Sequence, residues 1–72
     1  MVTSVYKVLK TDNDFSRAAN TQAPVAVFER RGDLAVCIVN YGGLVKEWSD
    51  DSVNIDDTYY RRDQFEFRIA LA

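Results

Sequence analysis

Histidine is absent from this 72-residue chain, and cysteine and proline each occur only once. Without histidine the chain lacks the commonest general base and the commonest metal ligand among protein side chains. The single cysteine, Cys37, cannot form an intrachain disulfide, so a secreted, disulfide-stapled mini-protein is excluded. We therefore expect no structural metal and no cofactor.

Long apolar runs are also missing. No run approaches the roughly 18 apolar residues that a membrane-spanning helix needs. The first four residues, MVTS, show no basic stretch followed by an apolar one, so a secretory signal peptide is not expected. These observations predict a cytoplasmic protein with no membrane partner.

Positive charge is in short supply. Nine Lys and Arg residues face 11 Asp and Glu residues, which gives a formal net charge of −2. A chain with this balance has no global field that would hold a phosphate backbone, so nucleic acid is disfavoured as a partner unless a local basic patch forms.

What the chain does contain favours β structure. Sixteen residues are β-branched and nine are aromatic, and these types fit a pleated, half-buried surface. The length allows one small domain, residues 1–72. We expect an α+β or mostly-β fold: an antiparallel meander sheet of four to five strands with one short helix.

The clearest strand is the last one. Phe65, Phe67, Ile69 and Leu71 alternate with more polar residues, which predicts an antiparallel strand with one face on the core. This strand lies at the end of the chain, where a sheet-edge position is easy, and an apolar edge is a template for association. In the monomeric alternative, the central hairpin and the first strand cover this edge within the chain.

A β-hairpin is predicted in the middle of the chain. Residues 25–30 and 34–39 are apolar runs on either side of Arg31-Gly32-Asp33. The loop is either residues 31–32 or residues 32–33, and the sequence leaves both registers open. Residues 34–39 are apolar on both faces, so we expect a central strand with Cys37 buried in it.

The remaining elements are shorter. Residues 5–10 predict a strand, and residues 11–14 offer capping side chains for a helix of one or two turns that ends near Asn20. Residues 44–48 suit either a helix or a strand. Aspartate-rich turns are expected on both sides of a short segment at 53–55.

The aspartate-rich segment fails as a calcium loop. Counted from Asp50, an EF-hand pattern requires glycine at position six and glutamate at position twelve, where this chain has Ile55 and Arg61. No phosphate-binding loop, nucleophile elbow or dinucleotide fingerprint occurs either. We therefore expect that the protein is not an enzyme.

Two tyrosines and two arginines stand next to one another at residues 59–62, which makes this segment the candidate interaction site. These two residue types are enriched at the energetic centres of protein interfaces. Structural packing is the competing interpretation, because alternate residues of a strand point to opposite faces. The candidate residues are Tyr59, Tyr60, Arg61 and Arg62, together with Trp48 as an aromatic anchor for a partner.

Residues 23–39 resemble the β-hairpin of Phd/YefM-type antitoxins, in which a Pro-Val strand, an Arg-Arg-Gly-like turn and an Ala-Val strand recur. The resemblance covers about a quarter of the chain. It implies a dimeric DNA-binding regulator. The sequence departs from the family in its shorter helix before the hairpin and in its aspartates and strong β-strand after Gly43.

Two functions remain open on the sequence. The first is a small non-enzymatic protein-binding domain: an inhibitor, adaptor or accessory subunit of the size that phages and mobile elements encode. The alternative is the antitoxin-like dimeric DNA-binding regulator, carried by five arginines: Arg30, Arg31, Arg61, Arg62 and Arg68. We also expect a homodimer, with the C-terminal strand or residues 59–62 in the contact, because a core this small benefits from association.

Overall fold

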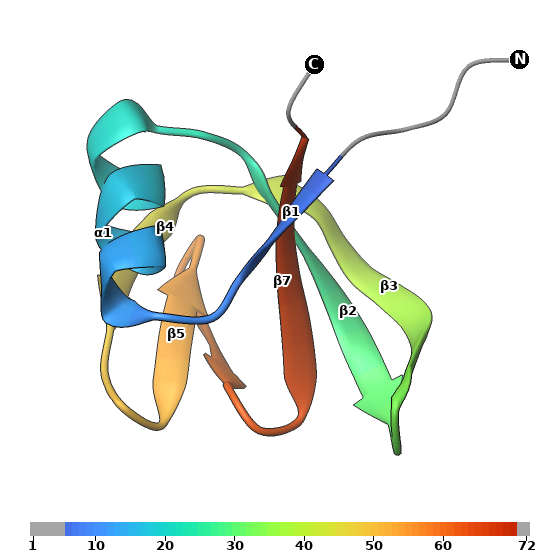
Figure 1. Ribbon diagram of the computed structural model, residues 1–72. Coiled ribbons are helices and arrows are strands. Elements are labelled where there is room, and N and C mark those ends of the chain that lie inside the picture. The colour runs from blue at the N-terminus through green and yellow to red at the C-terminus, as the bar shows by residue number, and fades with distance from the viewer. Residues whose placement is uncertain (1–5, 71–72) are drawn as a thin grey trace, which may run out of the picture.

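The computed structural model describes residues 6–70, apart from the side chains of residues 35–37. These residues form one helix and seven strands in two antiparallel sheets, which confirms the mostly-β class (Figure 1). The structure has more strands than the four to five expected, because short strands form on both sides of the aspartate turns. The elements are β1 (Tyr6–Leu9), α1 (Asp12–Thr21), β2 (Val25–Arg31), β3 (Leu34–Gly43), β4 (Val45–Trp48), β5 (Ser52–Ile55), β6 (Thr58–Arg61) and β7 (Phe65–Ala70).

The larger sheet has the strand order β1-β7-β2-β3. Strand β7 is therefore central, since Phe67 pairs with Leu9 of β1 on one side and with Val27 of β2 on the other. The expected edge position of the C-terminal strand is wrong. The apolar face of β7 lies on the core, where Phe67 is 2% exposed, so this face is not available to a second copy of the chain.

Strand β3 occupies the edge instead, and its expected central position is wrong as well. Among the described residues it pairs only with β2. Among its described side chains, Leu34 is 67% exposed and Val39 43%, so the strand is not buried on both faces at these positions. The side chain of Cys37 lies outside the described part of the chain, so its burial stays a prediction.

The hairpin between β2 and β3 has residues 32–33 as its loop, which decides between the two registers. Arg31 pairs with Leu34, and Gly32 takes a φ of 62°. A positive φ at the first central residue is what two-residue hairpin turns require. Three register shifts then follow along the pairing of β2 with β3, and at each of them β3 carries an extra residue.

The smaller sheet has the order β4-β5-β6. Residues 45–48, which the sequence left open between helix and strand, are strand β4. The turn between β5 and β6 is Asp56-Asp57, with φ values of 51° and 72°. Aspartate tolerates this left-handed conformation, and the amide oxygen of Asn54 accepts a 2.8 Å hydrogen bond from the backbone N–H of Asp57.

Helix α1 is longer than the one or two turns expected. It begins after Thr11, whose hydroxyl accepts from the N–H of Asp14, while the Asp14 carboxylate accepts from the N–H of Thr11. This reciprocal capping box fixes the start of the helix. The chain leaves the helix at Gln22, which has a left-handed φ of 54°.

One hydrophobic core serves the helix and both sheets. The chain crosses between the sheets at Leu44 and again at residues 62–64, and Figure 1 shows α1 beside the smaller sheet. No helix in the described part of the chain is long and apolar enough to cross a membrane. The buried apolar side chains are Leu9, Phe15, Ala18, Val25, Val27, Val45, Val53, Ile55 and Phe67.

Candidate functional site

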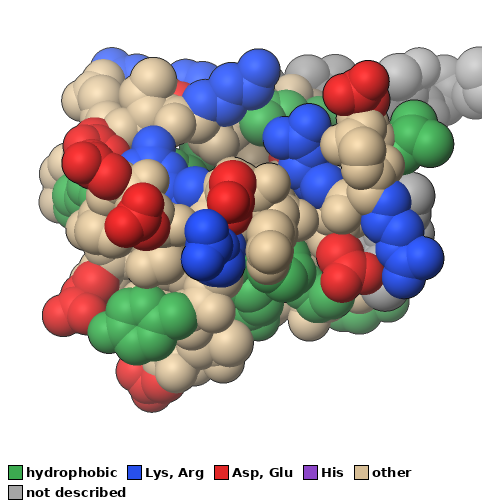
Figure 2. Space-filling view, turned by 90° about the horizontal axis from the view of Figure 1, so that it is seen from below, with side chains coloured by type: hydrophobic (Ala, Val, Ile, Leu, Met, Phe, Trp, Pro, Cys, Tyr) green, Lys and Arg blue, Asp and Glu red, His purple; other side chains and the backbone are tan. Residues whose placement is uncertain are grey.

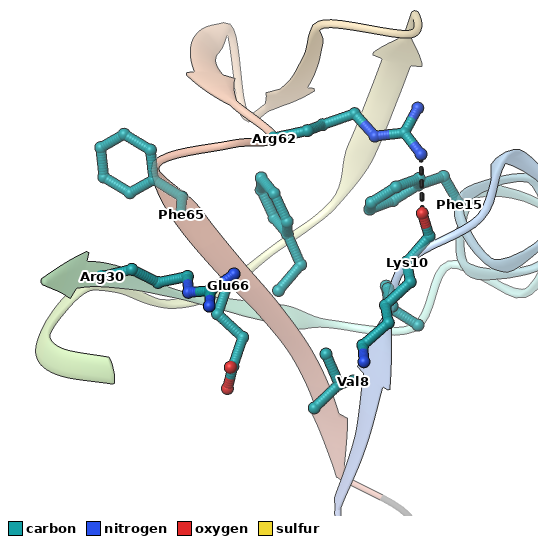
Figure 3. A pocket seen from close by; sticks show the side chains of 9 residues that line it. Val8, Lys10, Phe15, Arg30, Arg62, Phe65 and Glu66 are labelled. Atoms are coloured by element: carbon teal, nitrogen blue, oxygen red, sulfur yellow. Dashed lines mark hydrogen bonds between the residues drawn. The ribbon is translucent and has the colours of Figure 1, made fainter. Parts of the chain in front are cut away.

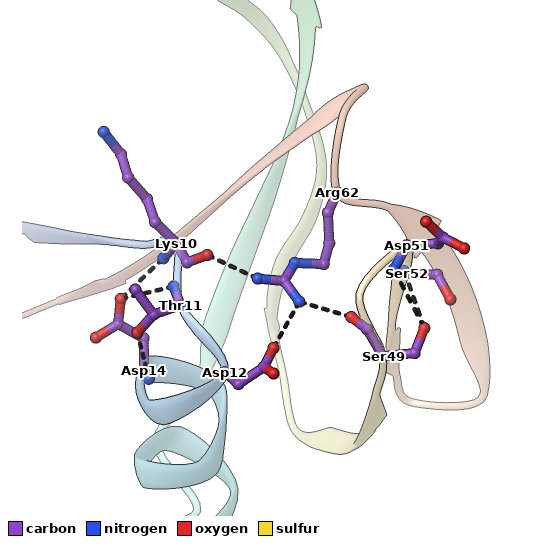
Figure 4. A network of polar contacts seen from close by, with 8 residues as sticks. All are labelled: Lys10, Thr11, Asp12, Asp14, Ser49, Asp51, Ser52 and Arg62. Atoms are coloured by element: carbon purple, nitrogen blue, oxygen red, sulfur yellow. Dashed lines mark hydrogen bonds and ion pairs between the residues drawn. The ribbon is translucent and has the colours of Figure 1, made fainter.

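The structure turns Arg62 inward, against the core. Its Nη1 donates to the carboxylate of Asp12 at 2.8 Å and to the carbonyl of Ser49 at 2.6 Å, and its Nη2 donates to the carbonyl of Lys10 at 2.7 Å (Figure 4). The side chain is only 18% exposed. Arg62 therefore connects the start of α1, the β4–β5 loop and the β6–β7 turn.

Tyr60 and Trp48 also face the core side of the smaller sheet. Tyr60 makes edge-to-face contacts with the rings of Phe65 and Phe67, with ring centres 5.2 and 6.5 Å apart. Trp48 is half-buried against the same core. Three of the five candidate residues thus contribute to packing.

The other two candidates, Tyr59 and Arg61, are exposed on β6, as the strand alternation predicts. Their polar groups already have partners within the chain. The Tyr59 hydroxyl donates to Glu47 at 2.8 Å, and Arg61 makes two 3.0 Å hydrogen bonds to the carboxylate of Asp63. These hydrogen bonds from Arg61 lower the pKa of Asp63. The structure does not bring the five candidates together on one surface.

Four of the five arginines of the regulator hypothesis have an acidic partner within the chain: Arg31, Arg61, Arg62 and Arg68. Arg68 is paired with Glu66 and lies between the rings of Tyr6 and Phe28, 4.3 and 4.2 Å from their centres. Arg31 lies 3.9 Å from Glu29. Figure 2, a view from below Figure 1, shows acidic and basic side chains interspersed over that face. Past Gly43 the chain continues in strands and not in helices.

Strand β3 carries the exposed apolar surface, which the sequence did not single out. Of the five exposed large hydrophobic residues in the described part of the chain, three belong to β3: Leu34, Val39 and Tyr41. The other two, Tyr6 and Tyr59, lie on different strands. The sequence did contain a signal for an exposed edge. Charged residues and proline usually protect an edge strand from association, and residues 34–43 contain neither.

The register shifts help to explain this exposure. Between Phe28 and Val27 of β2 the partner residue on β3 changes from Ile38 to Asn40, so Val39 is an extra residue. Between Val27 and Val25 the partner changes from Asn40 to Gly43, and Tyr41 falls in this second irregular stretch. Bulges of this kind bend a strand and redirect its side chains.

Among the described residues no group of three or more acidic, cysteine or histidine side chains could hold a metal ion. No protein-family model, no curated protein and no solved structure matches this chain.

Proposed function

We propose that the chain is a small non-enzymatic protein-binding domain, an inhibitor, adaptor or accessory subunit of the kind that phages and mobile elements encode. The observation that carries the proposal is the concentration of exposed apolar side chains on one uncharged edge strand, β3. Exposed apolar residues are ordinary where they are scattered singly, whereas three of the five in the described part of the chain lie on this one strand.

Tyr41 is the expected centre of the contact. Its side chain is 83% exposed, and burial of a tyrosine removes a large apolar area from water while its hydroxyl keeps a polar partner. Val39 and Leu34 add apolar area on the same strand. A complementary partner therefore presents an apolar surface without charges opposite β3, since a buried unpaired charge costs several kcal/mol.

The contact is expected to use side chains more than added strand hydrogen bonds. Addition of a partner strand requires a regular row of backbone groups, and the three register shifts interrupt that row along β3.

A second copy of the chain is the competing occupant of this surface. The homodimer expected from the sequence can no longer use the apolar face of β7, which is in the core. Residues 59–62, the other contact expected from the sequence, lie on and next to edge strand β6, and β3 is a further edge. Two copies related by a two-fold axis at β3 would place its exposed apolar residues against their own counterparts.

Photo-crosslinking in the native host tests the proposal. Tyr41→benzoylphenylalanine places the probe on β3, and Tyr59→benzoylphenylalanine is the matched control, an exposed tyrosine on β6. We expect a discrete adduct with a second, different protein from position 41 and a much weaker one from position 59. Further replacement of Val39→Lys should abolish the adduct.

Two outcomes would contradict the proposal. Equal adducts from both positions would remove the special role of β3. An adduct with the mass of two copies of this 8.2 kDa chain would replace the heterologous partner with a homodimer.

A further inference from the structure

A cavity of about 340 Å³ opens beside the start of β7, and no described residue of β3 lines it (Figure 3). Its apolar walls come from Val8, Phe15 and Phe65. Three cationic side chains line it as well: Lys10, Arg30 and Arg62. The volume is within the range of small-ligand pockets.

The cavity exists because β1 ends early. Strand β1 pairs with β7 from Tyr6 opposite Ala70 to Leu9 opposite Phe67, and Lys10 then leads into the capped helix. Strand β2 continues along the other side of β7 as far as Phe65. On the β1 side, no described strand pairs with Phe65.

The backbone of Phe65 faces this gap. The N–H of Arg30 donates to the carbonyl of Gln64 at 2.9 Å, so the peptide groups of Gln64 point toward β2. Peptide groups alternate along an antiparallel strand, and those of Phe65 therefore point to the β1 side. The gap thus offers one donor and one acceptor in the arrangement that an extended peptide backbone matches.

The charge around the gap is positive and in part uncompensated. Glu66, the acidic side chain of the lining, is paired with Arg68. Arg62 uses three of its five donors within the chain. The side chains of Lys10 and Arg30 are exposed and have no ion-pair partner among the described residues. Figure 3 shows Lys10 and Arg30 on opposite sides of β7.

From these observations we infer that the cavity binds the C-terminal end of an extended peptide, with an apolar last side chain and a free carboxylate. The last side chain contacts Val8 and Phe65, the two partly exposed apolar residues of the lining. Its carboxylate binds between Arg30 and Lys10, and its backbone pairs with Phe65. The inference adds a second contact to the proposed protein-binding function, but it does not depend on β3.

The probe is the synthetic peptide acetyl-Gly-Ala-Ala-Phe with a free C-terminal carboxylate, titrated into the isotope-labelled domain and followed by amide chemical shifts. We expect shifts at the amide of Phe65 and at its neighbours. The same peptide with a C-terminal amide should bind at least tenfold more weakly, because it lacks the charge that Arg30 and Lys10 attract. Free 3-phenylpropionate should also bind more weakly, because it lacks the peptide backbone.

Arg30→Gln should weaken binding of the acid peptide at least fivefold. The matched control is Arg31→Gln, which changes the next residue, outside the cavity lining, and should leave binding unchanged. Tyr41→Lys should also leave binding of the acid peptide unchanged. A failure of peptide binding at the cavity can therefore be distinguished from a failure of partner binding at β3.

Absence of shifts at Phe65 at millimolar peptide would overturn the inference, as would equal affinities for the acid and the amide. Binding of 3-phenylpropionate as tight as that of the acid peptide would overturn the assignment to a peptide.

Discussion

The guanidinium of Arg62 lies 4.9 Å from the centre of the Phe15 ring and pairs with Asp12, which is 50 residues earlier in the chain. Phe15 is 1% exposed at the centre of the core. Arg62 therefore covers the core where the helix, the β4–β5 loop and the β6–β7 turn meet. Some of the residues that suggested an interaction site in the sequence, Arg62 among them, therefore stabilise the packing of the fold.

Arg62→Met should strongly destabilise the protein. The change keeps much of the apolar stem but leaves the carbonyls of Lys10 and Ser49 and the carboxylate of Asp12 without this donor. We expect a loss of about 2–4 kcal/mol in the free energy of unfolding, because charge-assisted, half-buried hydrogen bonds are lost together. Urea denaturation measures the loss.

The adjacent Arg61→Met is the matched control for that experiment. Its ion pair with Asp63 is on the surface, where such pairs contribute little. The urea midpoint of Arg61→Met should therefore equal that of the wild type. Equal destabilisation by the two variants would show that Arg62 has no special structural role.

Gly43, the last residue of β3, lies directly against the end of β5 in the other sheet. A Cβ at this residue would lie 2.5 Å from the Cγ2 atom of Ile55 and 2.5 Å from the Oδ2 atom of Asp56. Gly43→Ala should cost about 1–3 kcal/mol through overpacking, as measured by thermal or urea unfolding. Gly42→Ala meets only the Cβ of Pro24, at 3.3 Å, and should cost less. A reversed order of the two variants would be inconsistent with this packing.

Acid should destabilise the protein partly through Asp14. Hydrogen bonds from the backbone N–H groups of Lys10 and Thr11, with help from Lys7, lower the pKa of this carboxyl to about 2 from its ordinary value of 3.8. The folded state therefore binds fewer protons than the unfolded state in this range, and stability falls as the pH drops from about 4 to about 2.

The test is the urea midpoint measured across that pH range for the wild type and for Asp14→Asn. The variant should be less stable near neutral pH, because it loses the ionised cap, and its stability should fall less steeply in acid. Asp50→Asn, in the β4–β5 loop, is the control and should follow the wild type. An unchanged acid slope in Asp14→Asn would argue against the role of the cap.

Local patterns along the chain predicted much of the fold. The alternation at Phe65, Phe67 and Ile69 predicted β7, and the Gly-containing tip predicted the hairpin. Both signals depend only on neighbouring residues and on what a turn or a half-buried strand requires. The mostly-β class followed from them.

The strand order was not predictable in the same way. An apolar, uncharged segment such as residues 34–39 is compatible with a central strand and with an exposed binding edge, and the sequence-based preference for the first was wrong. Which strand pairs with β7 depends on contacts between Leu9, Val27 and Phe67, which are far apart in the sequence.

The candidate site was still harder to predict from the sequence. Tyr and Arg side chains suit both an interface and a packed surface, and only the fold shows that Tyr60 and Arg62 face inward while Tyr59 and Arg61 face outward. Two of the exposed apolar residues of β3, Leu34 and Val39, belong to the segment that the sequence assigned to the core. Bulges in β3 arise from its pairing with β2, and no local sequence motif predicts their positions.

Hydrogen exchange of the isolated domain tests the central claim most directly, namely that β3 is an uncovered edge open to a partner. The account predicts the slowest amide exchange in β7, which has a strand on each side, and fast exchange at the outward amides of β3, independent of protein concentration. Protection along all of β3 equal to that of β7 in a dilute, monomeric sample would contradict it.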